Sequence, residues 1–502
     1  FIQSIEDNME SIMAVQVAEA NLFKAGSGTG TNRSPIRSSK ERLTGGGRAS
    51  GPVSFMKGYD AYAGVIKSGG KTRRAAKMEI LNVEHPDIVE FIESKQKEEK
   101  KAWALIEQGY SGGMNGEAYS SVAFQNCNMS IRASDDFMQA VKNNGDWQTR
   151  FVSDGGICET LKAREVLRKV AEGTHICGDP GMQFDTIINK YHTSKVSGKI
   201  NASNPCSEYM FLDDSACNLA SINLMKFLTS EAKFDTDSFK KVVDRFITSM
   251  ELFVDGSSYP TEKIAQNSHD FRPLGLGYAN LGALLMSFGL PYDSDEGRAV
   301  AAAITALMCG EAYKASAKIA SHVGPFPRYP ENKDSMLQVI AMHRDHVKDI
   351  DVNKIPYDLR YLVNEAWDAW SDAYELGKQY GFRNSQATVL APTGCLVPNS
   401  FVSTDKGLLR LGSLGNRKGS QWQDVSFKVM TDEGPRDATK FYVNGQASTR
   451  KIVTSSGYEI QGTEKHKIKV MNTITGQLEW KRFDEVNAGD VVPLSMNTIF
   501  GE

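Results

Sequence analysis

The sequence lacks the features that mark secreted, membrane-spanning and nucleic-acid-binding proteins. Its seven cysteines in 502 residues have no disulfide-scaffold spacing, and no secretory signal is recognisable, which favours a reducing compartment, the cytoplasm. The longest apolar run, Ala299–Met308, is far shorter than the roughly 20 residues that a membrane span needs, so we expect no membrane association. A net charge of −3 gives no general attraction to nucleic acid, so any anion-binding site must be local.

No metal site is expected from the spacing of cysteine and histidine. Cys127, Cys158, Cys177 and Cys309 have no close Cys or His at a metal-ligand spacing, and His175 is too near Cys177 for the usual zinc patterns. We interpret these four cysteines as ordinary core or surface thiols.

The chain opens at Phe1, without an initiator methionine. The segment FIQSIEDNMESIM has the apolar spacing of an amphipathic helix, with Ile5, Met9 and Ile12 on one face. We therefore expect the sequence to begin inside a domain, with an upstream part missing.

The stretch 204–217, NPCSEYMFLDDSAC, gathers residue types that suit catalysis. Its two cysteines, Cys206 and Cys217, are eleven positions apart, and Cys206 stands between Asn204 and Glu208 at alternate positions. In an extended segment alternate side chains point the same way, so we expect these three to face one site. A thiol for radical or nucleophilic chemistry, a carboxylate base and an amide that holds a hydroxyl would then converge. The alternative is a pair of structural cysteines beside a proline turn.

Two glycine-rich segments suit phosphate binding. Residues 26–52 are punctuated by glycine but lack the G-x-G-x-x-G spacing and a clear preceding strand. Residues 68–78, SGGKTRRAAKM, place Lys71, Arg73, Arg74 and Lys77 around two glycines. Exposed backbone N–H groups and guanidinium groups suit a di- or triphosphate. Together, with helix-like sequence between them, the segments favour nucleotide binding over a flexible surface loop.

Helical and strand-like stretches alternate up to residue 394, which indicates an α/β domain with a largely parallel sheet. Strand-like pieces lie at 76–81 and 121–126. One helix is expected at 82–106 with Asn82 as its cap, and others at about 159–171, 236–255, 297–322 and 358–381.

NPCSE followed by ACNLASINL resembles the active-site loop of ribonucleotide reductases, most closely the adenosylcobalamin-dependent (class II) branch. FKAGSGTGTN, SGGKTRRAAKM and RNSQATVLAPTG resemble the same branch. The resemblance implies a ten-stranded α/β barrel with the Cys206 loop threaded through its centre. It also implies reduction of ribonucleoside di- or triphosphates to 2′-deoxyribonucleotides for DNA synthesis.

The resemblance also implies a role for each catalytic candidate. Cys206 would be the thiyl radical that abstracts the 3′-hydrogen, and Glu208 the base on the 3′-hydroxyl. Asn204 would hold the substrate hydroxyls. Cys217 would be one half of a redox dithiol, regenerated by thioredoxin or a similar reductant, and its partner cysteine is implied just upstream of Phe1.

Nucleotide-contacting positions follow from the same resemblance. Residues 38–52 and 68–78 resemble two specificity loops that carry the identity of a bound dNTP or ATP effector to the substrate base. Effector contacts are implied for Asp7, Arg37, Lys71, Thr72, Arg73 and Arg74. Substrate contacts are implied for Gly28, Asn204, Pro205, Cys206, Ser207, Glu208, Pro392, Thr393 and Gly394.

Three interpretations of the first 394 residues stay open. The first is a class II reductase with adenosylcobalamin as cofactor, which forms a homodimer. The second is a class I large subunit, which would need a metal-radical partner subunit. The third is a nucleotide-binding regulatory module, against which the Asn-Cys-Glu arrangement argues. A D-x-H-x-x-G cobalamin signature is absent, but it belongs to a different way of binding the cofactor.

The composition changes at Cys395. The family pattern would continue from ATVLAPTG with Thr-Ile-Ser, whereas this chain continues with short alternating strands and Gly/Asn/Asp turns. Residues 395–502 resemble the N-terminal part of an intein, an all-β Hint-type module. Cys395 would attack the Gly394 carbonyl, and Thr463 and His466 of GTEKH would activate that amide. The sequence thus predicts a reductase barrel at 1–394 and an intein segment at 395–502. A separate C-terminal intein–extein fragment would be its partner if the intein is split.

Overall fold

The computed structural model describes residues 1–66, 76–113 and 116–391, together with short segments of the tail. The tail segments are 401–404, 407–410, 422–431, 434–442, 450–453, 459–462, 467–471, 478–482, 485–487 and 490–491. The chain divides into two compact units: one contains residues 1–222, 235–278 and 299–391, and the other contains 223–234, 279–298 and 392–502. Ten of the predicted site residues lie outside the described residues: Lys71, Thr72, Arg73, Arg74, Pro392, Thr393, Gly394, Cys395, Thr463 and His466.

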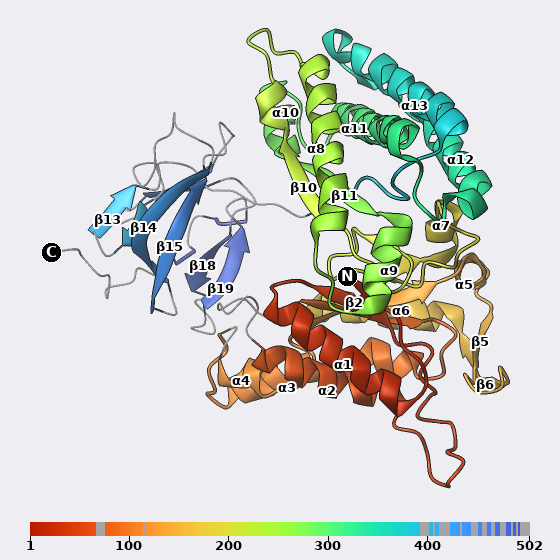
Figure 1. Ribbon diagram of the computed structural model, residues 1–502. Helices are drawn as coiled ribbons and strands as arrows, with labels where there is room; N and C mark the ends of the chain where they lie inside the picture. Colours follow the sequence, from red (N-terminus) through yellow and green to blue (C-terminus); the bar gives the residue numbers. More distant parts are fainter. Residues whose placement is uncertain are drawn as a thin grey trace. The chain divides into compact units, whose positions relative to one another are not determined.

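The first unit is built on a five-stranded sheet in the order β1-β2-β3-β4-β7, with every neighbouring pair parallel (Figure 1). Its strands are β1 (Ile2–Gln3), β2 (Thr29–Asn32), β3 (Lys77–Asn82), β4 (Cys127–Ala133) and β7 (Gly181–Phe184). The central strand β3 is buried along nearly all its length, as is typical of parallel strands covered on both faces.

Helices from the first half of the chain pack against this sheet. They are α1 (Met9–Lys24), α2 (Gly51–Val65), α3 (Ile88–Glu107), α4 (Glu117–Ser120), α5 (Asp135–Lys142), α6 (Ala163–Cys177) and α7 (Asp185–Lys190). One apolar core joins Met56 of α2, Phe91 of α3 and Val170 of α6 to Leu81 and Ile131 of the central strands. Burial of these side chains holds the helices on the sheet.

A second group of helices follows later in the same unit (Figure 1). It comprises α8 (Thr236–Gly256), α9 (Glu262–Phe271), α11 (Asp295–Val323), α12 (Tyr329–His346) and α13 (Tyr361–Tyr380). The predicted helices at 236–255, 297–322 and 358–381 are therefore confirmed within a few residues. The short 3₁₀ turns η3 (Val347–Asp349), η4 (Val352–Lys354) and η5 (Tyr357–Leu359) connect α12 to α13.

Smaller strands complete the first unit. They are β5 (Asp146–Arg150), β6 (Ile157–Lys162), β8 (Ala202–Ser203), β9 (Met210–Phe211), β10 (Asn218–Asn223) and β11 (Leu274–Ala279). Strands β5–β6, β8–β9 and β10–β11 pair two by two, and Leu276 of β11 forms a parallel bridge with Thr388. The described residues of this unit thus give one five-stranded sheet and three short ladders.

Four predictions of local structure were wrong in part. The helix predicted at 82–106 begins at Ile88, because Asn82 ends β3 and its side chain bonds with the Asn32 and Glu84 side chains. The helix predicted at 159–171 begins at Ala163, because residues up to Lys162 pair with β5.

The predicted strand at 121–126 is a turn, in which Phe124 has a left-handed backbone (φ 64°) and the Asp60 carboxylate accepts the next two amides. The predicted N-terminal helix begins only at Met9, after Asn8 caps it through the Ser11 amide (2.8 Å).

The first glycine-rich segment contains the strand β2, which was not predicted from the sequence. Its sequence, TGTN, has low strand propensity, and the backbone around Gly30 is buried. A Cβ atom at Gly30 would lie 1.7 Å from the carbonyl oxygen of Ser203. Tertiary packing against β8, and not local propensity, therefore selects glycine here.

The second unit contains η2 (Leu224–Phe227), α10 (Leu281–Ser287) and the tail. The tail strands are β12 (Phe401–Thr404), β13 (Gly407–Arg410), β14 (Trp422–Thr431), β15 (Gly434–Tyr442), β16 (Arg450–Val453), β17 (Glu459–Gly462), β18 (Lys467–Met471) and β19 (Leu478–Arg482). A four-stranded antiparallel sheet has the order β13-β12-β14-β15, and β16–β17 and β18–β19 form two hairpin-like pairs. Every element described beyond residue 400 is a strand.

Candidate active site

The Asn204–Glu208 segment forms a tight turn, which corrects the expected extended conformation. It connects β8 to β9, and the Ser207 amide donates to the Asn204 carbonyl (3.1 Å). Ser207 has a left-handed backbone, with φ 62°. The Asn204 side chain accepts from the Tyr209 amide (3.0 Å), which closes the turn from within. The expectation that alternate side chains point the same way therefore does not apply here. Asn204, Cys206 and Glu208 nevertheless belong to one short turn.

The turn presents Cys206 outward and packs Pro205 inward. Cys206 is exposed, whereas Pro205 is buried and its carbonyl accepts from the side-chain Nδ2 of Asn128 in β4 (2.8 Å). A Cβ atom at Gly28 would lie 2.7 Å from the Pro205 ring. Gly28, predicted as a substrate contact, thus lies directly against the turn, and the absence of a side chain there lets the turn approach β2.

Glu208 carries a buried acceptor. Its Oε2 atom is inaccessible to solvent and has no hydrogen-bond partner among the described residues. An unpaired buried carboxylate oxygen costs free energy unless something outside the chain supplies a donor. The position suits a carboxylate whose natural partner is a ligand hydroxyl.

Cys217 lies close to the same carboxylate. Burial raises the pKa of the Cys217 thiol to about 12, and the nearby Glu208 carboxylate adds to the increase. An antiparallel bridge between Ile2 and Ser215 brings this segment to the start of the chain, with N···O distances of 2.9 and 3.2 Å. The structure therefore places Cys217 next to Phe1 as well as next to Glu208.

A cavity of about 210 Å³ opens beside Cys217. Hydroxyl and amide groups dominate its polar lining, which includes Ser27, Asn218 and Tyr259. The Asn218 Oδ1 atom is buried without a partner in the described part of the chain. Since Ser27 precedes Gly28, this cavity adjoins the strand on which the Cys206 turn rests.

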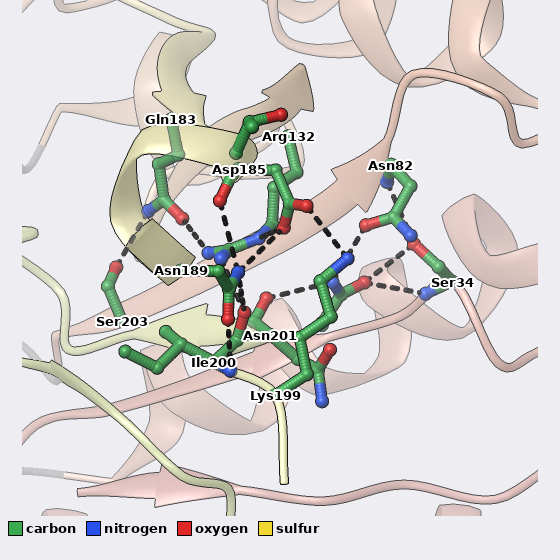
Figure 2. Close-up of polar contacts among 12 residues, drawn as sticks. Ser34, Asn82, Arg132, Gln183, Asp185, Asn189, Lys199, Ile200, Asn201 and Ser203 are labelled. Atoms are coloured by element: carbon green, nitrogen blue, oxygen red, sulfur yellow. Dashed lines mark hydrogen bonds and ion pairs between the residues drawn. The ribbon is translucent and has the colours of Figure 1, made fainter. Parts of the chain in front are cut away.

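A polar network at the carboxyl ends of the parallel strands anchors the segment that leads to the turn (Figure 2). Arg132 of β4 donates to the Ile200 carbonyl and to the carboxylate of Asp185 (2.7 Å for the latter). Asn189 accepts from the Ile200 amide (3.0 Å), so residue 200 is held on both sides of its peptide backbone. None of these residues was a sequence candidate, because they are scattered along the chain and share no spacing.

The network reaches the turn itself through Gln183 of β7. Its Nε2 atom donates to the hydroxyls of Ser203 (2.8 Å), at the start of the turn, and of Ser207 (3.2 Å), directly after Cys206. Figure 2 shows the amide of Gln183 between Ser203 and Arg132. The structure thus adds Gln183 to the residues around the candidate site.

Asp7 and Arg37, predicted as effector contacts, meet in the structure. The Arg37 guanidinium and backbone amide both donate to the Asp7 carboxylate, at 2.5 and 3.1 Å. Both residues line a pocket of about 240 Å³ between the start of α1 and the start of α2, with Ile12, Leu43 and Phe55 as its apolar walls. The two residues implied as effector contacts thus lie together at one pocket, and their contact with an effector stays a prediction.

Four buried charges lie between this pocket and the sheet. Arg33 and Lys77 each pair with both Glu19 and Glu79, at 2.5 to 3.2 Å, and all four side chains are at most 3% exposed. Tyr59 covers them, with the Arg33 guanidinium 4.0 Å from its ring centre. The Tyr59 hydroxyl donates to the carbonyl of Ile12, which lines the pocket (2.7 Å). The quartet joins α1 to β3 and to the segment after β2. Lys77, predicted among the cations for a phosphate, is instead buried in β3 and paired with Glu19 and Glu79.

Metal clusters, disulfides and membrane-spanning helices were not expected from the sequence, and the following statements concern the described residues only. Among those residues no cluster of His, Cys, Asp and Glu has the arrangement of a metal site. The six described cysteines form no disulfide. In the same part of the chain, no helix has both the length and the apolar character needed to cross a bilayer.

Comparison with known proteins assigns the family. The model of the ribonucleotide reductase barrel domain matches residues 1–398. The chain belongs to the ribonucleotide reductase barrel-domain family.

Three curated relatives illustrate the similarity. A vitamin B12-dependent ribonucleotide reductase of Rhodopirellula baltica is 57% identical over 398 residues, which are 79% of this chain and 38% of that protein. The protein of the same description from Streptomyces coelicolor is 50% identical over 401 residues, 79% of this chain and 41% of that protein.

A vitamin B12-dependent ribonucleoside-diphosphate reductase of Mycobacterium tuberculosis is 33% identical over 334 residues, 66% of this chain and 45% of that protein. This reductase barrel chain therefore spans less than half the length of these relatives.

Proposed function

We propose that this barrel is the catalytic domain of a vitamin B12-dependent (class II) ribonucleotide reductase. The observation that carries the proposal is the buried, unpartnered Oε2 of Glu208 in the described part of the chain, in the same turn as exposed Cys206 and next to the Cys217 thiol. A base, a radical-forming thiol and a reducing thiol are what removal of a ribose 2′-hydroxyl requires. The descriptions of the relatives support the class II assignment over a class I large subunit.

The residues would divide the chemistry as follows. Cys206 abstracts the 3′-hydrogen, and Glu208 accepts the proton of the 3′-hydroxyl. Asn204 holds a substrate hydroxyl, and the 2′-oxygen leaves as water. Cys217 supplies one of two reducing thiols, and the pair becomes a disulfide that a thioredoxin-like protein reduces.

Adenosylcobalamin fits this arrangement because the Cys206 thiol is exposed and lies at the apex of its turn. When bound, it would supply the radical that starts the reaction. The high pKa of Cys217 means that this thiol stays protonated at neutral pH and can donate a hydrogen atom or a proton.

The surroundings of Phe1 support the placement of the second reducing cysteine. The Ile2–Ser215 bridge puts the chain's first residues beside Cys217, and Phe1 and Cys217 line one cavity. A cysteine one position before Phe1 would enter the same neighbourhood. We also propose that the five-stranded sheet is one half of the ten-stranded barrel.

The pocket at Asp7 and Arg37 supports a deoxynucleotide effector. Its walls combine an apolar surface for a base with an acid–base pair that can bond a ribose or a phosphate. The exposed apolar residues of α1 and α2, such as Val17 (64% exposed) and Val65 (79% exposed), suit coverage by a second copy of the chain, and we propose a homodimer.

For the tail we propose an N-terminal intein segment that self-processes at Gly394–Cys395. The change to an all-strand region supports it, and so does the family match, which ends at residue 398. A separate C-terminal fragment would complete the splicing reaction.

The reductase proposal is tested by nucleotide reduction in the complete protein. We expect cytidine nucleotide reduction with a dithiol and a deoxynucleotide effector to require adenosylcobalamin. We expect Cys206→Ser to abolish it, because the Ser hydroxyl does not form the required radical. Activity that needs an added metal-radical subunit would move the protein to class I. Full activity of Cys206→Ser would remove the role of this thiol.

A further inference from the structure

We propose that Gln183, oriented by Arg132, is a positioning residue that holds the Cys206 turn in its reactive geometry. This inference rests on the proposed reductase function. Gln183 is 3% exposed and lies on β7, twenty-three positions before Cys206. It contacts Ser203, three positions before Cys206, and Ser207, directly after it, and it acts through these two residues.

The orientation of the Gln183 amide is determined by chemistry. The Arg132 Nη1 atom donates to the Gln183 Oε1 atom (3.1 Å), and a guanidinium can only donate. The oxygen of the amide must therefore face Arg132, and its NH₂ group must face the turn. Arg132 is itself fixed, since it is 2% exposed and its other groups bond Asp185 and the Ile200 carbonyl.

The NH₂ group then holds the turn at both ends. It donates to Ser203, the last residue of β8, and to Ser207, the residue directly after Cys206. The two hydroxyls lie 3.3 Å apart, so a single amide group joins them across the turn. Asn204, Pro205 and Cys206 are the residues between the two contacts.

Ser207 needs such support because its backbone is strained. A non-glycine residue with φ near +60° is energetically unfavourable and persists only where its surroundings determine the conformation. The Gln183 bond and the Ser207–Asn204 backbone bond together hold this conformation. Without the tether we expect the turn to relax and Cys206 to leave its position relative to Glu208.

Gln183→Met tests the role, because Met keeps the volume and removes both donors. We expect kcat for nucleotide reduction to fall tenfold or more, with the KM for the nucleotide unchanged within about twofold. Gln183→Glu should recover most of the activity, since its carboxylate accepts from Arg132 and the Ser207 hydroxyl can turn to donate to it. The complete protein with its cofactor is used throughout.

Ser207→Ala provides the second variant. It removes the Ser207 hydroxyl that accepts from Gln183, and the backbone at position 207 still has to adopt a positive φ in the reactive turn. We expect its loss of kcat to be no larger than that of Gln183→Met, and the double variant to be no worse than Gln183→Met alone, because the bond to Ser207 is among those that Gln183→Met removes. A double variant whose loss of kcat equals the sum of the two single losses would overturn the proposed tether. If Gln183→Met does not fold, Ser207→Ala alone decides the matter, and full kcat in that variant would overturn the tether.

Hydrogen exchange gives a readout that is independent of the reaction. In Gln183→Met we expect the amides of 204, 207 and 209 to exchange about tenfold faster, while those of β3 are unchanged. Ser316→Ala is the matched control: Ser316 is fully buried in α11 and bonds Asn384, so its loss is destabilising but leaves the turn untouched.

Unchanged kcat together with unchanged exchange would overturn the proposal. If the wild-type protein reduced no nucleotide, the reductase assignment would fail, whereas the exchange measurement would still decide the tether.

Discussion

Asp213 is a single side chain whose burial makes the fold sensitive to pH. Its Oδ1 atom is buried and has no partner among the described residues, and its Oδ2 atom accepts from Asn201 (3.0 Å). Burial, and secondarily the neighbouring Asp214 charge, raise the pKa of Asp213 to about 6. The folded state therefore favours the protonated carboxyl more than the unfolded chain does.

The sign of the effect follows from this shift. The stability that the group contributes is fully present below about pH 4 and is lost as the pH rises through about 6, at a cost of up to about 3 kcal/mol. Asp213→Asn should raise the free energy of unfolding at pH 8 by about 1–3 kcal/mol, and by little at pH 4. Urea unfolding at both pH values checks this, and an equal effect at both would contradict it.

Short motifs pointed to individual site residues, whose roles stay predictions. The structure brings Glu208 close to Cys217 and pairs Asp7 with Arg37. Gln183 and Arg132 were missed because their role depends on the parallel register of β4 and β7, which brings together residues about fifty positions apart. No pattern within a local window contains that information.

The strand β2 is the element on which the turn depends. Gly30 brings its backbone against Ser203, and a Cβ atom there would meet the Ser203 carbonyl oxygen at 1.7 Å. Gly30→Ala must push β8 away from β2, so it should lower the free energy of unfolding by about 2–3 kcal/mol and reduce nucleotide reduction.

Gly58→Ala is the matched control for this substitution. Gly58 lies in α2, with nothing within 4 Å of an added Cβ atom, so we expect a gain of about 0.5–1 kcal/mol. Thermal unfolding of both variants makes the comparison. Equal stability of Gly30→Ala and the parent protein would mean that β2 and β8 are not in fixed contact.

Helices were predictable where an apolar pattern extended over many residues. Short strands were not, because pairing with another strand determines their structure. Helices α8 and α13 repeat their apolar stripe over many turns, and α11 is a long alanine-rich segment, so the ends of all three were found within a few residues. The short strands β2 and β6 carry no such signal. Thr29 and Gly30 are in a strand because β3 pairs with them, and residues 157–162 are in a strand because β5 does.

For the molecule as a whole, the proposed junction at Cys395 predicts a specific chemical reactivity. If Cys395 attacks the Gly394 carbonyl, the chain holds a thioester in equilibrium with the amide at that bond. Incubation with a thiol and hydroxylamine should then cleave the complete protein between these residues, as measured by intact mass. Cys395→Ala should block cleavage, whereas Cys309→Ala should not. Cleavage of the Cys395→Ala variant at the same bond would refute the assignment.

The bridge between Ile2 and Ser215 has a consequence for biosynthesis. Its two sides are separated by more than two hundred residues, so the wall around Cys217 forms only after the ribosome has synthesised both sides. Until then the Cys217 thiol has the ordinary acidity of an exposed cysteine and is open to oxidants. Once the bridge closes, burial raises the pKa of the Cys217 thiol and suppresses its thiolate. A nascent chain therefore passes through a period in which the Cys217 thiol is open to unspecific oxidation, and closure of the bridge ends that period.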